Sequence, residues 1–155
     1  MYIVQVASEC APVIKAGGLG DVVFGLSREL ENQGHFVDVI LPKYDCMRYD
    51  HISELHQAYD DLNVPWGGGS VHCTVFGGKV HGLNCFFIEP HGEAGNFFNR
   101  GKYYGDNDDN VRFAFFSRAV LEYMCMRNKR PEIIHCHDWQ TGLLPVMLFE
   151  QYKYR

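Results

Sequence analysis

Lysine, glycine and aspartate come together in the segment Lys15-Ala16-Gly17-Gly18-Leu19-Gly20-Asp21, a short way into the chain. Glycine lets the backbone approach a ligand closely, and the first turn of a helix offers unpaired N–H groups to an anion. Lys15 would add a positive charge at the same place, so the segment is a candidate phosphate-binding loop. The alternative interpretation is a glycine-rich turn in which Asp21 is the N-cap of the next helix and Lys15 is solvated.

The spacing of these glycines does not favour a dinucleotide. It matches neither Gly-x-Gly-x-x-Gly nor the loop of a P-loop nucleotide-binding protein. An acidic residue that could grip a ribose at the end of the second strand is also missing, because Asp38 lies inside that strand and Pro42 ends it.

A second candidate site is the segment His135-Cys136-His137-Asp138-Trp139-Gln140. Imidazole and carboxylate groups can bind metals, so one alternative is a metal-dependent hydrolase that uses His135, His137 and Asp138. No cluster of further ligands elsewhere in the sequence completes such a site. Another alternative is that His135 is a hydrogen-bonded core residue and that Trp139 packs against the sheet edge.

A third candidate is the aromatic and polar stretch that runs from Asn96 through Tyr104 to Asp109 and Asn110. Sugar recognition uses apolar faces for the ring and hydrogen bonds for the hydroxyls. Long surface loops have the same composition, however, and Asp109 or Asn110 could simply cap the helix that begins there.

The elements that would position the first site form a βαβ unit. Residues 2–7 are an apolar run typical of a buried strand, and the following loop extends to Gly20. From Asp21 the apolar residues recur at helical spacing, and Gly34 stands where a C-terminal cap belongs. A second strand follows over residues 36–41. The glycine-rich loop is therefore expected at the carboxyl end of the first strand.

The rest of the chain adds hairpins and then a second strand–helix alternation. Short strands are predicted at 63–66, 71–76 and 83–88, separated by glycines at 67–69, 77–78 and 82; a helix at 110–127; an inner strand at 133–136; and a final helix at 143–152. The predicted fold is α/β, with an open, mainly parallel sheet, helices on both faces and an added β-hairpin region. Ligands of such sheets collect at the carboxyl ends of the strands, so the first two sites share a cleft if their strands are near neighbours.

Composition limits the possible functions. The chain has 155 residues, 46% of them apolar, and a formal net charge of −5. This is enough for one domain with its own core, and it gives no electrostatic footprint for nucleic acid or an anionic membrane. No apolar run has membrane-spanning length and no basic leader is visible, so a cytoplasmic protein is expected. Six cysteines without any Cys-x-x-Cys are expected to be reduced thiols.

Together the three segments resemble the bacterial glycogen synthase and plant starch synthase family of retaining glucosyltransferases. The resemblance rests on Ser8-Glu9-Cys10-Ala11-Pro12, Lys15 to Val22, Phe97-Phe98-Asn99-Arg100, Tyr104-Gly105-Asp106, Asp109 to Phe113, and His135 to Leu143. These motifs occur in family order along the whole chain. Segments around Trp66, Val71 to Val75 and Cys85 to Pro90 are most similar to the cyanobacterial branch.

The resemblance implies the N-terminal, Rossmann-like half of a GT-B fold, over residues 1–155. It implies transfer of glucose from ADP-glucose to an α-1,4-glucan, with no cofactor and no metal. Lys15, Gly17, Gly18, Asp138 and Gln140 would bind the donor.

The resemblance also assigns catalytic and acceptor-side residues. His137 and Asp21 would be catalytic, with Asp21 helping to hold the glucosyl unit. Tyr104, Asp109 and Asn110 would lie on the acceptor side. Many relatives carry His at the position of Gln140; glutamine cannot carry a proton, which leaves His137 as the candidate for proton transfer.

The resemblance also implies what this chain lacks. The C-terminal half of the family, with most of the nucleotide pocket, has no counterpart in residues 1–155, so a missing C-terminal domain is expected as a partner in cis or in trans. Little turnover is expected of the chain alone, and its exposed cleft face would favour self-association. The competing hypothesis is a stand-alone binding or regulatory module that pairs with a separately encoded half.

Overall fold

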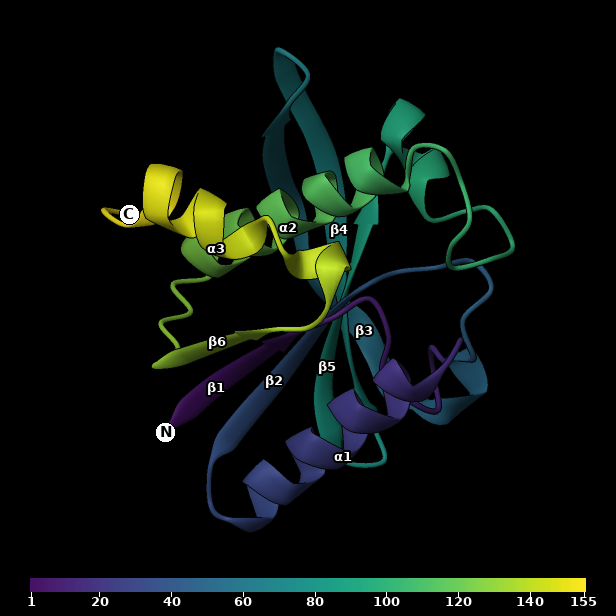
Figure 1. Cartoon of the computed structure of the whole chain (residues 1–155), viewed down its shortest axis with the longest axis vertical. Coiled ribbons are helices and arrows are strands. Elements are labelled where there is room, and N and C mark those ends of the chain that lie inside the picture. The colour runs from purple at the N-terminus through teal and green to yellow at the C-terminus, as the bar shows by residue number, and fades with distance from the viewer.

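The computed structural model describes all residues from 1 to 155 and contains one six-stranded sheet in the order β3-β4-β5-β2-β1-β6 (Figure 1). The parallel strands are β1 (Tyr2–Val6), β2 (Phe36–Pro42), β5 (Leu83–Pro90) and β6 (Ile133–Cys136). The antiparallel strands β3 (Ile52–Trp66) and β4 (Gly69–Val80) extend the sheet on one side. The predicted mainly parallel sheet with an added hairpin is confirmed.

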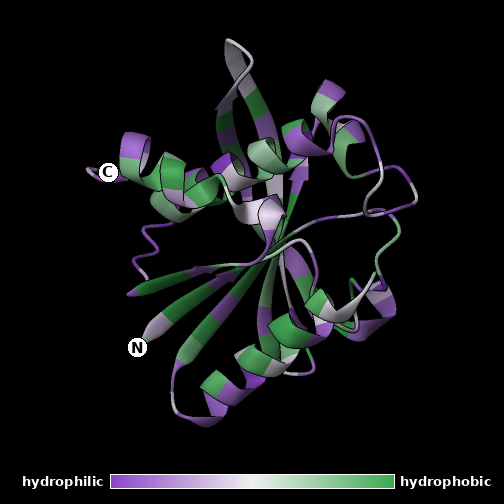
Figure 2. Cartoon of the chain, in the orientation of Figure 1, coloured by the Kyte–Doolittle hydropathy of each residue, from purple (hydrophilic) through white to green (hydrophobic).

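Helices cover both faces of this sheet, as predicted. Helix α1 (Gly18–Asn32) lies on one face, and α2 (Asp109–Met126) with α3 (Leu144–Met147) lies on the other (Figure 1). A π-helical turn, Leu148–Tyr152, continues α3. Apolar and polar residues alternate along α1 (Figure 2), and Val23 of this helix belongs to one core cluster of 34 buried apolar residues. One core for the whole chain agrees with the single domain expected from its length.

Two predicted turns occur where glycine is required. Gly34, directly after the C-cap Gln33 of α1, has φ +86°, and Gly67 and Gly68 between β3 and β4 have φ +61° and +82°. This left-handed region is costly for residues with a Cβ. The glycine-rich patch at 67–69 is therefore a hairpin turn, as predicted.

Three expected element boundaries and the expected sheet position of one strand were wrong. Helix α1 begins at Gly18, so Gly17 is the N-cap and Asp21 lies inside the first turn. Strand β4 runs through Gly77 and Gly78 to Val80, because β3 passes so close that a Cβ at these glycines would lie 2.9 Å and 2.5 Å from side-chain atoms of β3. Strand β3 begins eleven residues before the predicted start at Asn63. Strand β6 is an edge strand of this chain, not an inner one.

Candidate functional site

The glycine-rich loop and the histidine-rich segment leave the sheet side by side. Strands β1 and β6 are hydrogen-bonded neighbours, with Val6 opposite Cys136. The pairing continues one residue beyond β6, because the N–H of His137 donates to the carbonyl oxygen of Val6 at 3.1 Å. Both candidate segments therefore start from one carboxyl edge, so the condition for a shared cleft, that their strands are neighbours, is met.

The glycine-rich loop leaves unfilled space at the N-terminus of α1. A Cβ added to Gly17 or Gly18 would meet no atom within 4 Å, and both residues are exposed. The φ of Gly17 is −159°, an extended conformation that any residue adopts. Neither the backbone angle of Gly17 nor the packing around it requires glycine. Glycine there leaves open space at the first turn of the helix, where unpaired N–H groups face solvent.

Gly20 differs from the other two glycines of this loop. It is buried, and an added Cβ would lie 3.1 Å from the carbonyl oxygen of Ile14 and 3.3 Å from the nitrogen of Ala11. The two atoms nearest to an added Cβ are thus backbone atoms of the preceding loop, which cannot move aside easily. Gly20 serves the close packing of the helix against the loop after β1.

The buried residue that holds this loop is Glu9, which the site prediction missed. It is 3% exposed, and its Oε1 accepts hydrogen bonds from the backbone N–H groups of Ala16, at 2.6 Å, and Gly17, at 3.1 Å. A glutamate three residues after the end of an apolar strand was the available signal in the sequence, since a carboxylate that close to a core must find donors.

Lys15 and Asp21 form an exposed ion pair. The Nζ of Lys15 lies 2.9 Å and 2.8 Å from the two carboxylate oxygens of Asp21, and both side chains are about half exposed. The alternative interpretation, in which Lys15 is only solvated, therefore does not describe this side chain. The pair faces solvent beside Gly17 and Gly18, so an incoming anion can replace the carboxylate as the partner of Lys15.

His137 is a buried, neutral imidazole. It is 6% exposed, and its Nε2 lies 2.6 Å from Oε1 of Gln5 on β1, so the proton is on Nε2. Burial, and then the neighbouring His135, lower the pKa of His137 to about 4. At neutral pH this side chain can position a group or accept a hydrogen bond at Nδ1. It does not carry the charge that a proton donor would need.

The metal-site alternative is not supported by the geometry. The rings of His135 and His137 stack 4.1 Å apart on the same side of the strand, but the Nε2 of His137 is already bound by Gln5. The only three-residue cluster of metal-ligand type in the chain is Asp106, Asp108 and Asp109. Arginine and lysine side chains pair with those carboxylates.

Asp138 has a strained backbone. Its φ of +62° and ψ of −172° lie in a region that is essentially restricted to glycine, and its carboxylate accepts the N–H of Trp139 at 2.8 Å. Trp139 is 54% exposed and packs its ring at right angles to Phe113, with centroids 5.5 Å apart. Gln140 is 6% exposed and its Oε1 has no partner within the chain. Strain and an unpaired polar atom at one sheet edge are typical of a binding site.

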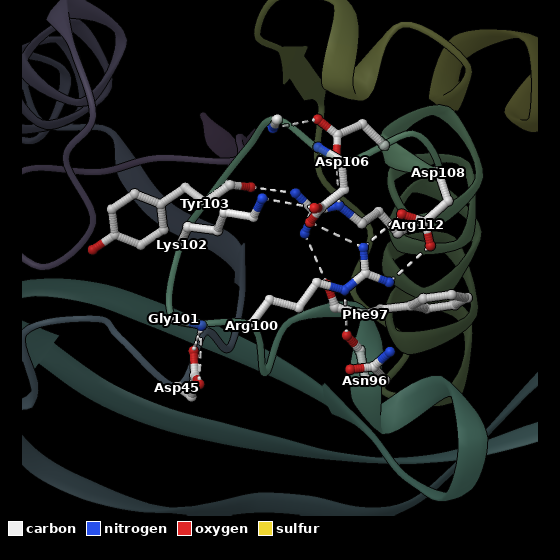
Figure 3. A network of polar contacts seen from close by, with 12 residues as sticks. Asp45, Asn96, Phe97, Arg100, Gly101, Lys102, Tyr103, Asp106, Asp108 and Arg112 are labelled. Carbon is white, nitrogen blue, oxygen red and sulfur yellow. Dashed lines mark hydrogen bonds and ion pairs between the residues drawn. The ribbon is translucent and has the colours of Figure 1, made fainter.

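The aromatic and polar stretch before α2 is fastened by its own charges (Figure 3). Arg100 binds the carboxylates of Asp106, at 3.1 Å, and Asp108, while the fully buried Arg112 binds Asp109 at 2.9 Å and the carbonyl oxygens of Phe97 and Tyr103. A short loop of about ten residues thus uses nearly all of its charged groups internally.

The three predicted sugar-binding residues of this stretch differ in exposure. The N–H groups of Gly105 and Asp106 donate to the carboxylate of Asp109, which therefore caps the loop and not the helix. The hydroxyl of Tyr104 is bonded to Ser8 and Glu9. Asn110 alone has an exposed side chain without a partner in the chain.

The chain matches the family described as the starch synthase catalytic domain over residues 2–155. The chain belongs to this family. It is 73% identical to glycogen synthase 1 of the cyanobacterium Trichormus variabilis over 154 residues, and 46% identical to the probable starch synthase 4 of Arabidopsis thaliana over 153 residues. The catalytic domain of starch synthase IV from Arabidopsis thaliana, solved with ADP and acarbose bound, superposes with a TM-score of 0.96 at 45% identity over 99% of this chain.

The chain spans only part of these relatives. It covers 31% of the Trichormus protein, 14% of the Arabidopsis protein and 31% of the solved catalytic domain. The resemblance of the motifs to glycogen and starch synthases is thus confirmed for the N-terminal part of a glycosyltransferase domain. None of the helices combines the length and the apolar character needed to cross a membrane.

Proposed function

We propose that this chain supplies one wall of the active site of a retaining glucosyltransferase that moves glucose from ADP-glucose to the end of an α-1,4-glucan. The observation that carries the proposal is the open N-terminus of α1 at Gly17 and Gly18, beside the strained Asp138 at the same sheet edge. The structure of a relative was solved with ADP and acarbose bound, a nucleotide and a saccharide, which supports both substrate classes.

The donor would bind across the two neighbouring loops. The diphosphate would take the N–H groups at the start of α1, and Lys15 would exchange Asp21 for a phosphate oxygen. Asp21, once it no longer pairs with Lys15, can accept a hydrogen bond from a hydroxyl of the glucosyl unit. Asp138 and Gln140 would hydrogen-bond the sugar from the segment after β6, and the unpaired Oε1 of Gln140 suits a hydroxyl donor.

We propose that His137 acts by position and not by proton transfer. Its lowered pKa keeps it neutral, and its Nε2–H is bound by Gln5. On the acceptor side, Asn110 has an exposed side chain, whereas Tyr104 and Asp109 would act by shaping the loop that carries them.

The other wall would come from the part of the relatives that this chain does not cover. Breaking the bond between glucose and phosphate needs preorganised charge on the departing ADP and exclusion of water. One lysine and one helix N-terminus do not provide both, and Lys15 and Trp139 are exposed. We therefore expect the chain by itself to bind substrates with little turnover. A stand-alone module that pairs with a separate half is the second candidate.

The direct experiment is complementation. The chain would be mixed with a separately expressed piece of the Trichormus glycogen synthase that begins after the matched region, and transfer from ADP-glucose to maltooligosaccharide would be measured. We expect transfer only when both pieces are present, and loss of it with Lys15→Ala. Full activity of residues 1–155 alone, or equal activity with Lys15→Ala, would contradict the proposal. UDP-glucose in a parallel assay would determine the nucleotide preference.

Two further expectations accompany this function. A cytoplasmic location is supported by the bacterial glycogen synthase relatives and by six unpaired cysteines. Self-association is proposed because Trp139, Leu143, Val146 and Phe149 are each about half exposed or more. Size-exclusion chromatography over a concentration series would test it, and a monomer at all concentrations would exclude it.

A further inference from the structure

The hydroxyl of Tyr104 joins two loops that are far apart in the sequence. It donates to Oε2 of Glu9 at 2.7 Å and lies 2.7 Å from the hydroxyl oxygen of Ser8. A phenol has one proton, so Ser8 donates to the Tyr104 oxygen. Burial and the adjacent Glu9 raise the pKa of Tyr104 well above its usual value, which keeps that proton in place at all ordinary pH.

The contact continues into the glycine-rich loop. Oε2 of Glu9 accepts the hydrogen bond from the Tyr104 hydroxyl, and Oε1 accepts hydrogen bonds from the N–H groups of Ala16 and Gly17. The carboxylate is therefore shared between the two loops, and its orientation depends on both. Because Glu9 binds the N–H groups of Ala16 and Gly17, the N–H groups available to an anion are those of the first helical residues, beginning at Gly18.

The other end of the connection is rigid. Arg112, fully buried, donates to the backbone carbonyl oxygen of Tyr103, and the Tyr104 ring packs on Phe113 with centroids 5.9 Å apart (Figure 3 shows Arg112 and Tyr103). Helix α2 thus fixes the backbone next to Tyr104, and the hydrogen bond from the Tyr104 hydroxyl in turn fixes the carboxylate of Glu9.

We propose that Tyr104 is a positioning residue, which orients Glu9 so that the loop before α1 is held open for the diphosphate of the donor. The proposal deepens the proposed function and rests on it for the identity of the ligand. The geometric part, that Tyr104 controls the hydrogen bonds of Ala16 and Gly17, stands independently of any ligand.

The test compares Tyr104→Phe with the matched variant Tyr103→Phe, in which the lost hydroxyl makes only a 3.5 Å contact with the carbonyl oxygen of Cys46. Amide hydrogen exchange of residues 1–155 would be followed by NMR. We expect exchange of the Ala16 and Gly17 amides to accelerate about tenfold or more in Tyr104→Phe, and to change less than about twofold in Tyr103→Phe. The Ile14 amide, bonded to Cys10, is the internal control and should not change.

A second readout uses ADP as the probe. We expect the Kd for ADP to rise about five- to tenfold in Tyr104→Phe, the effect of one hydrogen bond to a charged group, and to be unaffected in Tyr103→Phe. Unchanged exchange at Ala16 and Gly17 would overturn the positioning role whatever happens to ADP. Failure of the unsubstituted chain to bind ADP would count against donor binding by this chain and leave the exchange result to decide the positioning role.

Two more variants keep the outcome interpretable. Glu9→Gln retains an oxygen for the two amides, and its NH₂ can donate to Tyr104, so their exchange should stay slow. A Glu9→Gln variant with fast exchange would show that charge and not connectivity holds the loop, against the proposal. If Tyr104→Phe does not fold, Ser8→Ala removes only the donor to Tyr104 and should accelerate the same two amides by about threefold.

Discussion

The loop before α2 and the loop before α1 both contain charged residues and glycines, yet they use them in opposite ways. Around residues 100–109, the charged groups of Arg100, Asp106, Asp108 and Asp109 are paired with one another or with Arg112. Around residues 15–21, the only ion pair is exposed, and Gly17 and Gly18 border empty space. The first loop pairs its charges internally, whereas the second keeps an exposed ion pair beside open space. A motif can therefore mark either a structural device or a binding surface, and its partners distinguish the two.

Among the substitutions that test this contrast, Arg112→Met should cause the largest loss of stability. Its guanidinium is buried, binds Asp109 and two carbonyl oxygens, and packs on the Phe113 ring. Removing it leaves the two carbonyl oxygens without this donor and takes the buried cation away from Asp109, which keeps only its backbone N–H donors. We therefore expect the free energy of unfolding in urea to fall by about 3–5 kcal/mol. Lys102→Met, which removes only an exposed ion pair with Asp106, should cost less than about 1 kcal/mol. Equal effects would mean that the loop is not built on Arg112.

A pH series examines the neutral His137, which follows β6 at the same sheet edge as the loop before α1. Its folded pKa of about 4 is below the ordinary value of 6.5, so the unfolded chain binds the proton more readily between these values. Stability should decline as the pH falls through this window, by about 2 kcal/mol between pH 7.5 and 5.0. The loss of stability between pH 7.5 and pH 5.0 should be smaller by about 2 kcal/mol in His137→Gln. It should be unchanged in His56→Gln, the control at an exposed histidine. An unchanged pH dependence in His137→Gln would show that His137 is not buried as a neutral group.

Alanine substitution separates the glycines of the α1 loop. Gly20→Ala should lower the free energy of unfolding by about 1–2 kcal/mol, because its Cβ would press on backbone atoms. Gly17→Ala and Gly18→Ala should change it by no more than about 0.5 kcal/mol while weakening ADP binding. Urea unfolding and calorimetric ADP titration would measure both. Destabilisation by all three would make the loop a structural device like its counterpart before α2.

The smallest effect on stability is expected for Lys15→Met. Its ion pair with Asp21 is exposed, so the free energy of unfolding should change by less than about 1 kcal/mol. Binding of ADP should nevertheless weaken strongly, since Lys15 would be the one cation at the phosphates. A variant that loses stability and keeps its affinity for ADP would reverse the assignment.

The βαβ unit was predictable because its evidence is local. The apolar run of β1, the helical spacing after Asp21 and Gly34 each report on their own few residues. The start of β3 was not predictable, because residues 53–61 form a largely polar edge strand that contributes little to the core. The edge position of β6 was equally hidden, since a short apolar run does not reveal how many neighbours the strand has.

The site was partly predictable for the same reason. The sequence identified both segments at the carboxyl edge, and their contact depended on the pairing of β1 with β6. The neutral state of His137 depends on Gln5, which precedes it by 132 residues, and the fastening of Tyr104 depends on Glu9. Such partners are set by tertiary structure, and no local pattern contains them.

The central claim is that the surface beside Gly17 and Asp138 binds a nucleotide sugar. Chemical-shift mapping of isotope-labelled chain during titration with ADP-glucose tests it most directly. We predict that backbone amides of residues 16–21 and 137–140 shift in a saturable way, that those of residues 100–103 do not, and that Lys15→Met abolishes the shifts. Shifts confined to other surfaces, or identical titrations of the chain and of Lys15→Met, would contradict the account.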